Sequence, residues 1–367
     1  MRVRNYFGRK GLLFILFIPL GLFGQELTEL TTLNSTINET SGLIYLNEKL
    51  ITHNDSGGEA ALYEIDTLTG DTNRKVVISN AQNTDWEDIC FDDTYIYIGD
   101  FGNNTGSRTD LKIYRLAIAD YMSTPNDTVT SETINFTYAD QIDFTPTTNA
   151  SNFDAEALIA FGDKLYIFTK NWKDYQSNVY ALSKTPGSYQ IEKIDNLTTQ
   201  GLITGASYNA STSTLLLTGY LFSAFVIEIH SFTDDQFSGG IIDKYSIQPE
   251  GSFQIESITP LNDKAYYLSS EENSSGASKL YRLNSKNYLS VSDPNTLSDE
   301  LLYPNPATNQ LRIRSSKISR VEFFDYRGSL VKTTDKNEID ISELESGVYI
   351  LKVWDDGIVK YSRFIKQ

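Results

Sequence analysis

The sequence predicts an all-β protein in which one unit of about four short strands recurs, followed by a smaller β-domain. Three observations support this class. Similar segments recur in the same order five times between residues 40 and 285. No convincing helical periodicity lies between them, and turn-forming residues separate the strands. The chain has a single cysteine and 12% aromatic residues, so its stability must come from a hydrophobic core without intramolecular disulfides.

Each repeat contains three landmarks in a nearly constant register. The first is a short step, in most units polar to aliphatic, at 41–43, 87–89, 156–158, 205–207 and 256–258. The second is an alternating strand, at 50–55, 95–100, 165–170, 215–220 and 265–270. The third is a strand centred on an aromatic or aliphatic residue, at 61–66, 112–116, 178–182, 225–230 and 279–283. We expect a fourth strand at 74–79, 133–138, 189–194 and 243–248.

Four-stranded repeats of this length are typical of β-propeller blades, which bury their faces against neighbouring blades. The fifth unit lacks a fourth strand of its own, and residues 26–33 can supply it from the N-terminus. Such closure removes exposed sheet edges. We therefore expect a five-bladed β-propeller, with six blades as the alternative if residues 116–153 hide a degenerate unit. The blades resemble several extracellular propeller families, including gluconolactonase-like and paraoxonase-like enzymes, which implies the fold alone.

The N-terminus is typical of a secretory signal peptide. Four basic residues precede an apolar run at 11–23, which is too short to span a bilayer as a stable helix. We expect residues 1–24 to be removed and no membrane span in the mature chain. The net charge is −17 for the whole chain and −23 for residues 25–300 alone. A charge of that size would repel nucleic acid and anionic membranes.

Four motifs follow one another at the C-terminus: LYPNPATNQLRI from Leu302, VEFFDYRGSLV from Val321, IDISELESGVYILKV from Ile339, and IVKYSRFIKQ. Together they resemble the C-terminal sorting domain of the type IX secretion system of Bacteroidetes. The resemblance implies a compact β-sandwich of about seven strands that binds the secretion machinery and is normally removed on export. Together with the signal peptide, it implies a secreted or cell-surface protein that is exported first through Sec and then across the outer membrane. We expect the propeller at 25–292, a linker at 293–300 and the sorting domain at 301–367.

Acidic residues recur where the propeller geometry places one mouth of the central channel. This geometry gathers the starts of the first strands and the ends of the second strands on one face. Seven carboxylates are thereby expected to converge: Asp55, Asp85, Glu87, Asp100, Asp154, Glu156 and Glu256. Gathered carboxylates repel one another unless they are protonated or bridged by a cation, and calcium takes six to eight such oxygens. The alternative is that these residues only satisfy turn backbones.

The catalytic candidates are His53, Glu87 and Glu156. A histidine beside acids could act as a general base, and two acids could serve glycoside hydrolysis. The alternative is a structural histidine at a strand end. No nucleophile elbow, phosphate loop or histidine-based zinc motif is present.

Two functions therefore stay open. The first is a secreted module that binds a glycan or a protein, with an acidic, calcium-binding mouth. The second is a calcium-dependent extracellular hydrolase of a lactone, ester, phosphoester or glycosidic bond. The sequence does not decide whether the protein is an enzyme.

Overall fold

The computed structural model describes residues 27–221, 223–249, 254–274, 276–285, 302–315, 317–324, 330–355 and 358–367. The chain divides into two compact units, Met1–Lys286 and Asn287–Gln367. The predicted signal peptide (1–24) and linker (293–300) lie outside the described residues. Among the residues described, no helix is both long and apolar enough to cross a membrane.

The described part of the first unit contains five antiparallel sheets, two of which gain a parallel edge strand. The first sheet consists of β2 (Thr40–Leu46), β3 (Lys49–Asn54), β4 (Ala61–Ile65), β5 (Thr72–Ile78) and β9 (Thr128–Val129). The second consists of β6 (Trp86–Phe91), β7 (Tyr95–Asp100), β8 (Lys112–Ala117), β10 (Glu132–Tyr138) and β14 (Gly187–Ile191). The third consists of β11 (Ala155–Phe161), β12 (Lys164–Thr169), β13 (Ser177–Ser183) and β15 (Lys193–Leu197).

The fourth sheet consists of β16 (Leu202–Asn209), β17 (Thr214–Tyr220), β18 (Ala224–His230) and β19 (Ile241–Ser246). The fifth consists of β20 (Ile255–Asn262), β21 (Ala265–Ser270), β22 (Lys279–Asn284) and β1 (Leu27–Thr32). Where the structure describes this unit, three short helices accompany the sheets: η1 (Ser35–Ile37), α1 (Ile118–Ser123) and η2 (Phe237–Gly239).

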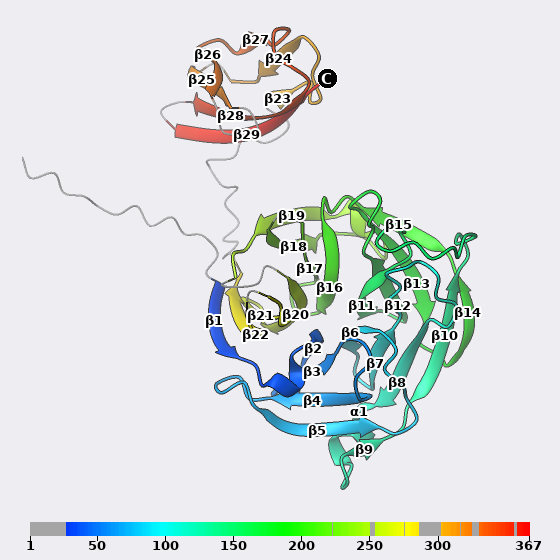
Figure 1. Ribbon diagram of the computed structural model, residues 1–367. Coiled ribbons are helices and arrows are strands. Elements are labelled where there is room, and N and C mark those ends of the chain that lie inside the picture. The colour runs from blue at the N-terminus through cyan, green and yellow to red at the C-terminus, as the bar shows by residue number, and fades with distance from the viewer. Residues whose placement is uncertain are drawn as a thin grey trace, which may run out of the picture. The chain divides into compact units, whose positions relative to one another are not determined.

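The five sheets stand around a ring (Figure 1). Their first strands lie against one another in the order β2, β6, β11, β16, β20 and back to β2. These inner strands are buried along most of their length, because both of their faces pack against neighbouring sheets. The outer strand β10 instead alternates between buried and exposed residues. This arrangement confirms the all-β propeller class, and each of the five predicted repeats forms one sheet.

The ring is closed by strands from both ends of the unit, as the sequence predicts. β1 pairs antiparallel with β22, with Leu27 opposite Leu283 and Thr32 opposite Lys279. An ion pair of 2.6 Å between Lys279 Nζ and Glu29 Oε2 supports the pairing. The propeller is thus closed without any residue of the C-terminal unit.

Two segments differ from the sequence-based prediction. The single strand expected at 189–194 is two strands, β14 and β15, which belong to different sheets. The reason is that Ile191 packs into a hydrophobic cluster shared by the second and third sheets, whereas Leu197 packs into one shared by the third and fourth. The long segment 116–153 forms α1, β9 and β10, which join the first two sheets and form no separate sheet among the described residues.

The described part of the second unit has seven strands, the number that the sequence predicts. One sheet holds β23 (Leu302–Tyr303), β24 (Gln310–Ile313) and β27 (Glu338–Asp340). The other holds β25 (Ile318–Phe324), β26 (Leu330–Thr334), β28 (Gly347–Asp355) and β29 (Ile358–Lys366). Residues from both sheets, among them Leu311, Phe323 and Phe364, share one buried cluster.

Candidate functional site

Three carboxyl groups from two neighbouring sheets meet at one mouth of the propeller channel. Asp55 directly follows β3, Asp85 directly precedes β6, and Glu87 is the second residue of β6. One carboxylate oxygen from each lies within 4.8 Å of the others. Glu87 is only 4% exposed, and no described residue donates a hydrogen bond to its carboxylate. Asp55 Oδ1 is also buried without a hydrogen-bond partner in the described part of the chain. We call these three residues the acidic triad.

A glycine makes this close approach sterically feasible. The backbone N–H groups of Phe101 and Gly102 donate to the carbonyl oxygen of Asp85 at 3.1 and 3.2 Å, so the loop after β7 lies against the triad. A Cβ at Gly102 would come within 2.0 Å of Glu87 Oε1 and 2.5 Å of Asp85 Oδ2. Any larger residue at this position would therefore displace the two carboxylates.

Burial and mutual repulsion raise the pKa values of the triad. Burial raises the pKa of Glu87 well above its ordinary value, and the charges of Glu156 and Asp55 raise it further. The pKa of Asp55 rises to about 8, again because of burial first and Asp85 second. Burial raises the pKa of Asp85 to about 6, although Arg108 opposes the rise. Near neutral pH the triad therefore holds protons that a bound cation could replace.

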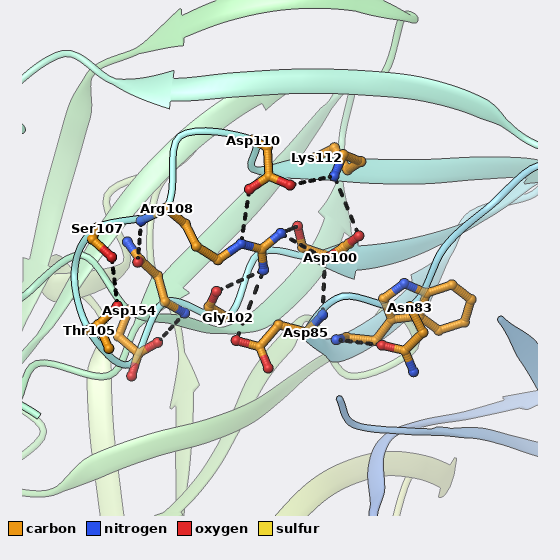
Figure 2. Close-up of polar contacts among 12 residues, drawn as sticks. Asn83, Asp85, Asp100, Gly102, Thr105, Ser107, Arg108, Asp110, Lys112 and Asp154 are labelled. Atoms are coloured by element: carbon orange, nitrogen blue, oxygen red, sulfur yellow. Dashed lines mark hydrogen bonds and ion pairs between the residues drawn. The ribbon is translucent and has the colours of Figure 1, made fainter. Parts of the chain in front are cut away.

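Asp100, the fourth predicted ligand, has its own cations. Arg108 Nη2 donates to Asp100 Oδ1 at 2.9 Å, and Lys112 Nζ lies 3.6 Å from Asp100 Oδ2 (Figure 2). Asp100 also accepts a hydrogen bond from the backbone N–H of Asp85 at 3.2 Å. Arg108 Nη1 is 4.0 Å from Asp85 Oδ2, at the limit of an ion pair. Asp100 thus fixes the backbone at Asp85, and the sequence analysis missed Arg108.

Asp154 and Glu156 surround a buried lysine. Lys170 Nζ lies 3.1 Å from Glu156 Oε1, and Lys170 is only 7% exposed. The lysine also lies over the rings of Trp172 and Tyr220, 5.3 and 5.6 Å from their centroids. Burial lowers the pKa of Lys170, but Glu156 and the other nearby acids raise it well above its ordinary value. This half of the mouth therefore contains an internal cation.

The two acids nearest Lys170 differ in their partners. Asp154 is fully buried and accepts hydrogen bonds from Trp172 Nε1 at 2.8 Å and from the backbone N–H of Asn103 at 2.7 Å. Burial raises the pKa of Glu156 well above its ordinary value, while Lys170 opposes the rise. Asp154 thus holds the loops that contain Asn103 and Trp172 in place, and Glu156 forms an ion pair with Lys170.

Glu256, from the fifth sheet, is 3% exposed. Its pKa rises to about 8, because of burial first and repulsion from Glu271 second. Glu271 follows β21 and was not among the ligands predicted from sequence. Its position could have identified it. Glu271 directly follows β21, the second strand of its repeat, just as Asp55 directly follows β3, the second strand of the first repeat.

His53, a catalytic candidate, is fully buried within β3. Its ring packs edge-on against Trp86, with centroids 5.6 Å apart, and its Nδ1 lies 3.0 Å from the carbonyl oxygen of Asn54. Burial lowers the pKa of His53 to about 4, so the ring is neutral at pH 7. None of its hydrogen bonds within the described residues reaches a carboxylate. The other two candidates, Glu87 and Glu156, lie at the mouth.

Asp88 lies just inside the acidic mouth and was not predicted. Its Oδ2 accepts hydrogen bonds from the backbone N–H groups of Leu158 and Ala206 at 2.8 and 3.1 Å. Its Oδ1 accepts one from the N–H of Ile89 at 2.8 Å. Asp88 is 1% exposed, so it fastens β6 to β11 and β16 inside the ring.

Fold and site together define a β-propeller with a divided acidic channel mouth, joined to a second small β-domain. Residues 301–367 match the family model of the secretion system C-terminal sorting domain. The C-terminal unit is therefore a sorting domain of the type IX secretion system, which confirms that prediction. It marks the chain for export to the cell surface or the medium.

The comparison with curated proteins gave no match. Among solved structures, the chain is similar to the PQQ-bound aldose sugar dehydrogenase of Streptomyces coelicolor, with 13% identity and a TM-score of 0.40, over 71% of this chain and 98% of that one. It is also similar to a GH43 β-xylosidase/α-arabinofuranosidase from a compost metagenome, in a calcium-free complex with xylotriose. That similarity has 10% identity and a TM-score of 0.42, over 71% and 94% of the two chains. Scores this low carry no argument about function.

Proposed function

We propose that the exported propeller is a ligand-binding module whose acidic triad holds one divalent cation, and that this cation is calcium. The observation that carries the proposal is Glu87, a 96% buried carboxylate without a hydrogen-bond partner among the described residues, which faces Asp55 and Asp85. A buried carboxylate in this situation is costly unless it is protonated or bound to a cation.

The donor atoms of the triad suit calcium. All three side chains offer carboxylate oxygens, and hard oxygen ligands in flexible geometry favour calcium over softer transition metals. Lys170 neutralises the other half of the mouth through Glu156. We therefore place one ion at the triad rather than several across all seven predicted acids.

The ligand class follows from the same coordination chemistry. Three carboxylates leave coordination positions of a calcium ion free for outside oxygens, since calcium takes six to eight. Sugar hydroxyls or protein carboxylates can supply them, so the expected ligand is a glycan or a protein. The charge of −23 on residues 25–300 makes nucleic acid an unfavourable partner.

The experiment combines metal analysis with binding. The purified mature propeller is exchanged into chelator and then screened against glycan arrays and surface proteins with and without calcium. The proposal expects calcium to raise the melting temperature and to be required for binding. Binding that is equal in chelator and in calcium would refute it.

A calcium-dependent hydrolase is the second candidate, because one specific observation favours it. Glu256, outside the triad, has a pKa raised to about 8 and interacts electrostatically with Asp55, so it could act as a general acid beside a cation that polarises the substrate. Turnover of chromogenic lactone, ester, phosphoester and glycoside substrates tests this candidate. Turnover that is lost in Asp85→Asn while folding persists would replace the binding module with the enzyme.

We also propose how the chain is divided and processed during export. The signal peptide at 1–24 directs Sec export, the functional propeller spans 25–292, and the sorting domain at 301–367 is removed after the linker at 293–300. Mass spectrometry of the protein in the medium and at the cell surface checks both ends. An exported chain that retains residues 301–367 would contradict removal.

A further inference from the structure

The propeller has a cavity that is formed where the five inner strands end. Its volume is about 480 Å³, within the usual range for small-molecule sites. Each inner strand contributes one half-buried ring residue to its wall: Tyr45, Phe91, Phe161, Tyr208 and Pro260. We call this cavity the axial cavity.

The axial cavity is separate from the acidic triad. Glu87 lies at the start of β6 and Phe91 at its end, so about 13 Å of strand lies between the two sites. Between them, Asp88 fastens β6 to its neighbours β11 and β16. None of the seven predicted metal ligands lines the axial cavity.

Two hydroxyl groups in the lining of the axial cavity neither accept nor donate a hydrogen bond within the described part of the chain. Thr259 is 1% exposed and lines the cavity, yet its hydroxyl forms no hydrogen bond with any described residue. The same holds for Ser207, which is half-buried. Both hydroxyls are therefore available to hydrogen-bond a ligand in the cavity.

The charged residues that line the cavity provide no counter-ion for an ionic ligand deep inside it. Two of its three charged lining residues, Asp92 and Lys184, form an ion pair of 2.9 Å. Asp93, the third, is exposed at the rim. A charged group inserted past the rings would therefore lack a counter-ion and would lose its hydration.

We propose that the axial cavity binds the terminal ring of a neutral saccharide. Such a ring has apolar C–H faces that pack against aromatic side chains, and hydroxyls that bond to Thr259 and Ser207. It carries no charge, as the lining requires. This site is independent of the cation proposed at the acidic triad.

Cys90 provides a direct measurement, because it is the sole cysteine of the chain and lines the cavity. The probe is methyl methanethiosulfonate, a small uncharged thiol reagent. It is used at alkaline pH because burial raises the pKa of the Cys90 thiol well above its ordinary value. The rate of Cys90 modification in the full propeller is followed while neutral methyl glycosides and disaccharides are titrated one at a time.

The proposal expects at least one sugar to slow the modification saturably, and equally so in chelator. Thr259→Val removes one hydroxyl with little change of shape. It should lower the affinity for that sugar about 2- to 10-fold, which is the effect of one lost hydrogen bond. Thr212→Val is the matched control, since Thr212 is exposed and does not line the cavity. The Thr212→Val variant should bind the sugar with the same affinity as the natural sequence.

Three results would overturn the proposal: no sugar slows the reaction, Thr259→Val and Thr212→Val bind the sugar equally, or only the apolar probe 1-naphthol protects Cys90. The melting temperature of each variant verifies that it is folded. Protection that persists in chelator while calcium fails to bind would separate this inference from the proposed function.

Discussion

The ammonium group of Lys170 lies 3.1 Å from the carboxylate of Glu156, and both side chains are almost fully buried at the channel mouth. This ion pair divides the acidic mouth. The half that contains Glu156 has its own cation. Among the described residues, the ion-pair partner of the triad of Asp55, Asp85 and Glu87 is Arg108, at 4.0 Å from Asp85. This difference is the reason that we propose an external cation at the triad.

Lys170→Met tests the internal cation. The substitution leaves Glu156 buried without its partner, so we expect the free energy of unfolding to fall by about 3–5 kcal/mol. The double variant Lys170→Met/Glu156→Gln should regain much of that loss, because it removes the unpaired charge. Urea unfolding at neutral pH in chelator measures both. A double variant no more stable than the single one would show that Glu156 is not the partner that matters.

The pH dependence of stability follows from the raised pKa values. The pKa of Asp55 rises from 3.8 to about 8 and that of Glu256 from 4.5 to about 8. Between the ordinary and the raised pKa values, the folded protein holds protons that the unfolded chain has lost. The free energy of unfolding should therefore fall as pH rises from about 4.5 towards 8. The slope is about 1.4 kcal/mol per pH unit for each group at most.

Calcium should flatten this dependence, because it replaces the proton of Asp55. Thermal unfolding in chelator and in calcium, across that pH range, measures the difference. Stability that rises with pH in chelator would contradict the assigned protonation.

Gly102→Ala tests the steric basis of the triad. The added Cβ would lie 2.0 Å from Glu87 Oε1, so the carboxylates must move apart and calcium affinity should fall about 10-fold or more. Gly58→Ala is the matched control, since its Cβ would meet no atom closer than 4.0 Å. Calcium titration of both variants makes the comparison. Equal affinities would show that the triad is not the site.

Ring closure by β1 predicts how the chain tolerates truncation. Removal of residues 301–367 should leave the melting temperature of the propeller unchanged but abolish export. Removal of 25–33 should instead expose the edge of β22 and destabilise or aggregate the protein. Calorimetry of both truncated chains, with a secretion assay for the first, checks this. A propeller that melts normally without 25–33 would refute the closure.

The fold could be predicted because its information is local and repeated. Alternation along each strand and the constant register between landmarks identify the sheets, and the unpaired fifth unit identifies β1 as the closing strand. The split at Glu192 was missed because Ile191 and Leu197 are apolar in the same way. Only the packing shows that they enter different clusters.

The site was predicted less completely. The constant register of the five repeats predicts that Asp55, Asp85 and Glu87 lie at one mouth of the channel. It does not show which acids have counter-ions. Arg108 reaches Asp100 from a loop eight residues away, and Lys170 turns back to Glu156, so both pairings depend on side-chain reach. The position of His53 against Trp86 depends on packing between sheets in the same way.

The central claim is tested most directly by isothermal titration of calcium into the metal-free mature propeller, alongside Glu87→Gln. The account predicts one ion bound per chain, and an affinity reduced about 10-fold or more when the buried carboxylate becomes an amide of the same shape. No binding by the unmodified propeller, or equal binding by Glu87→Gln, would contradict it.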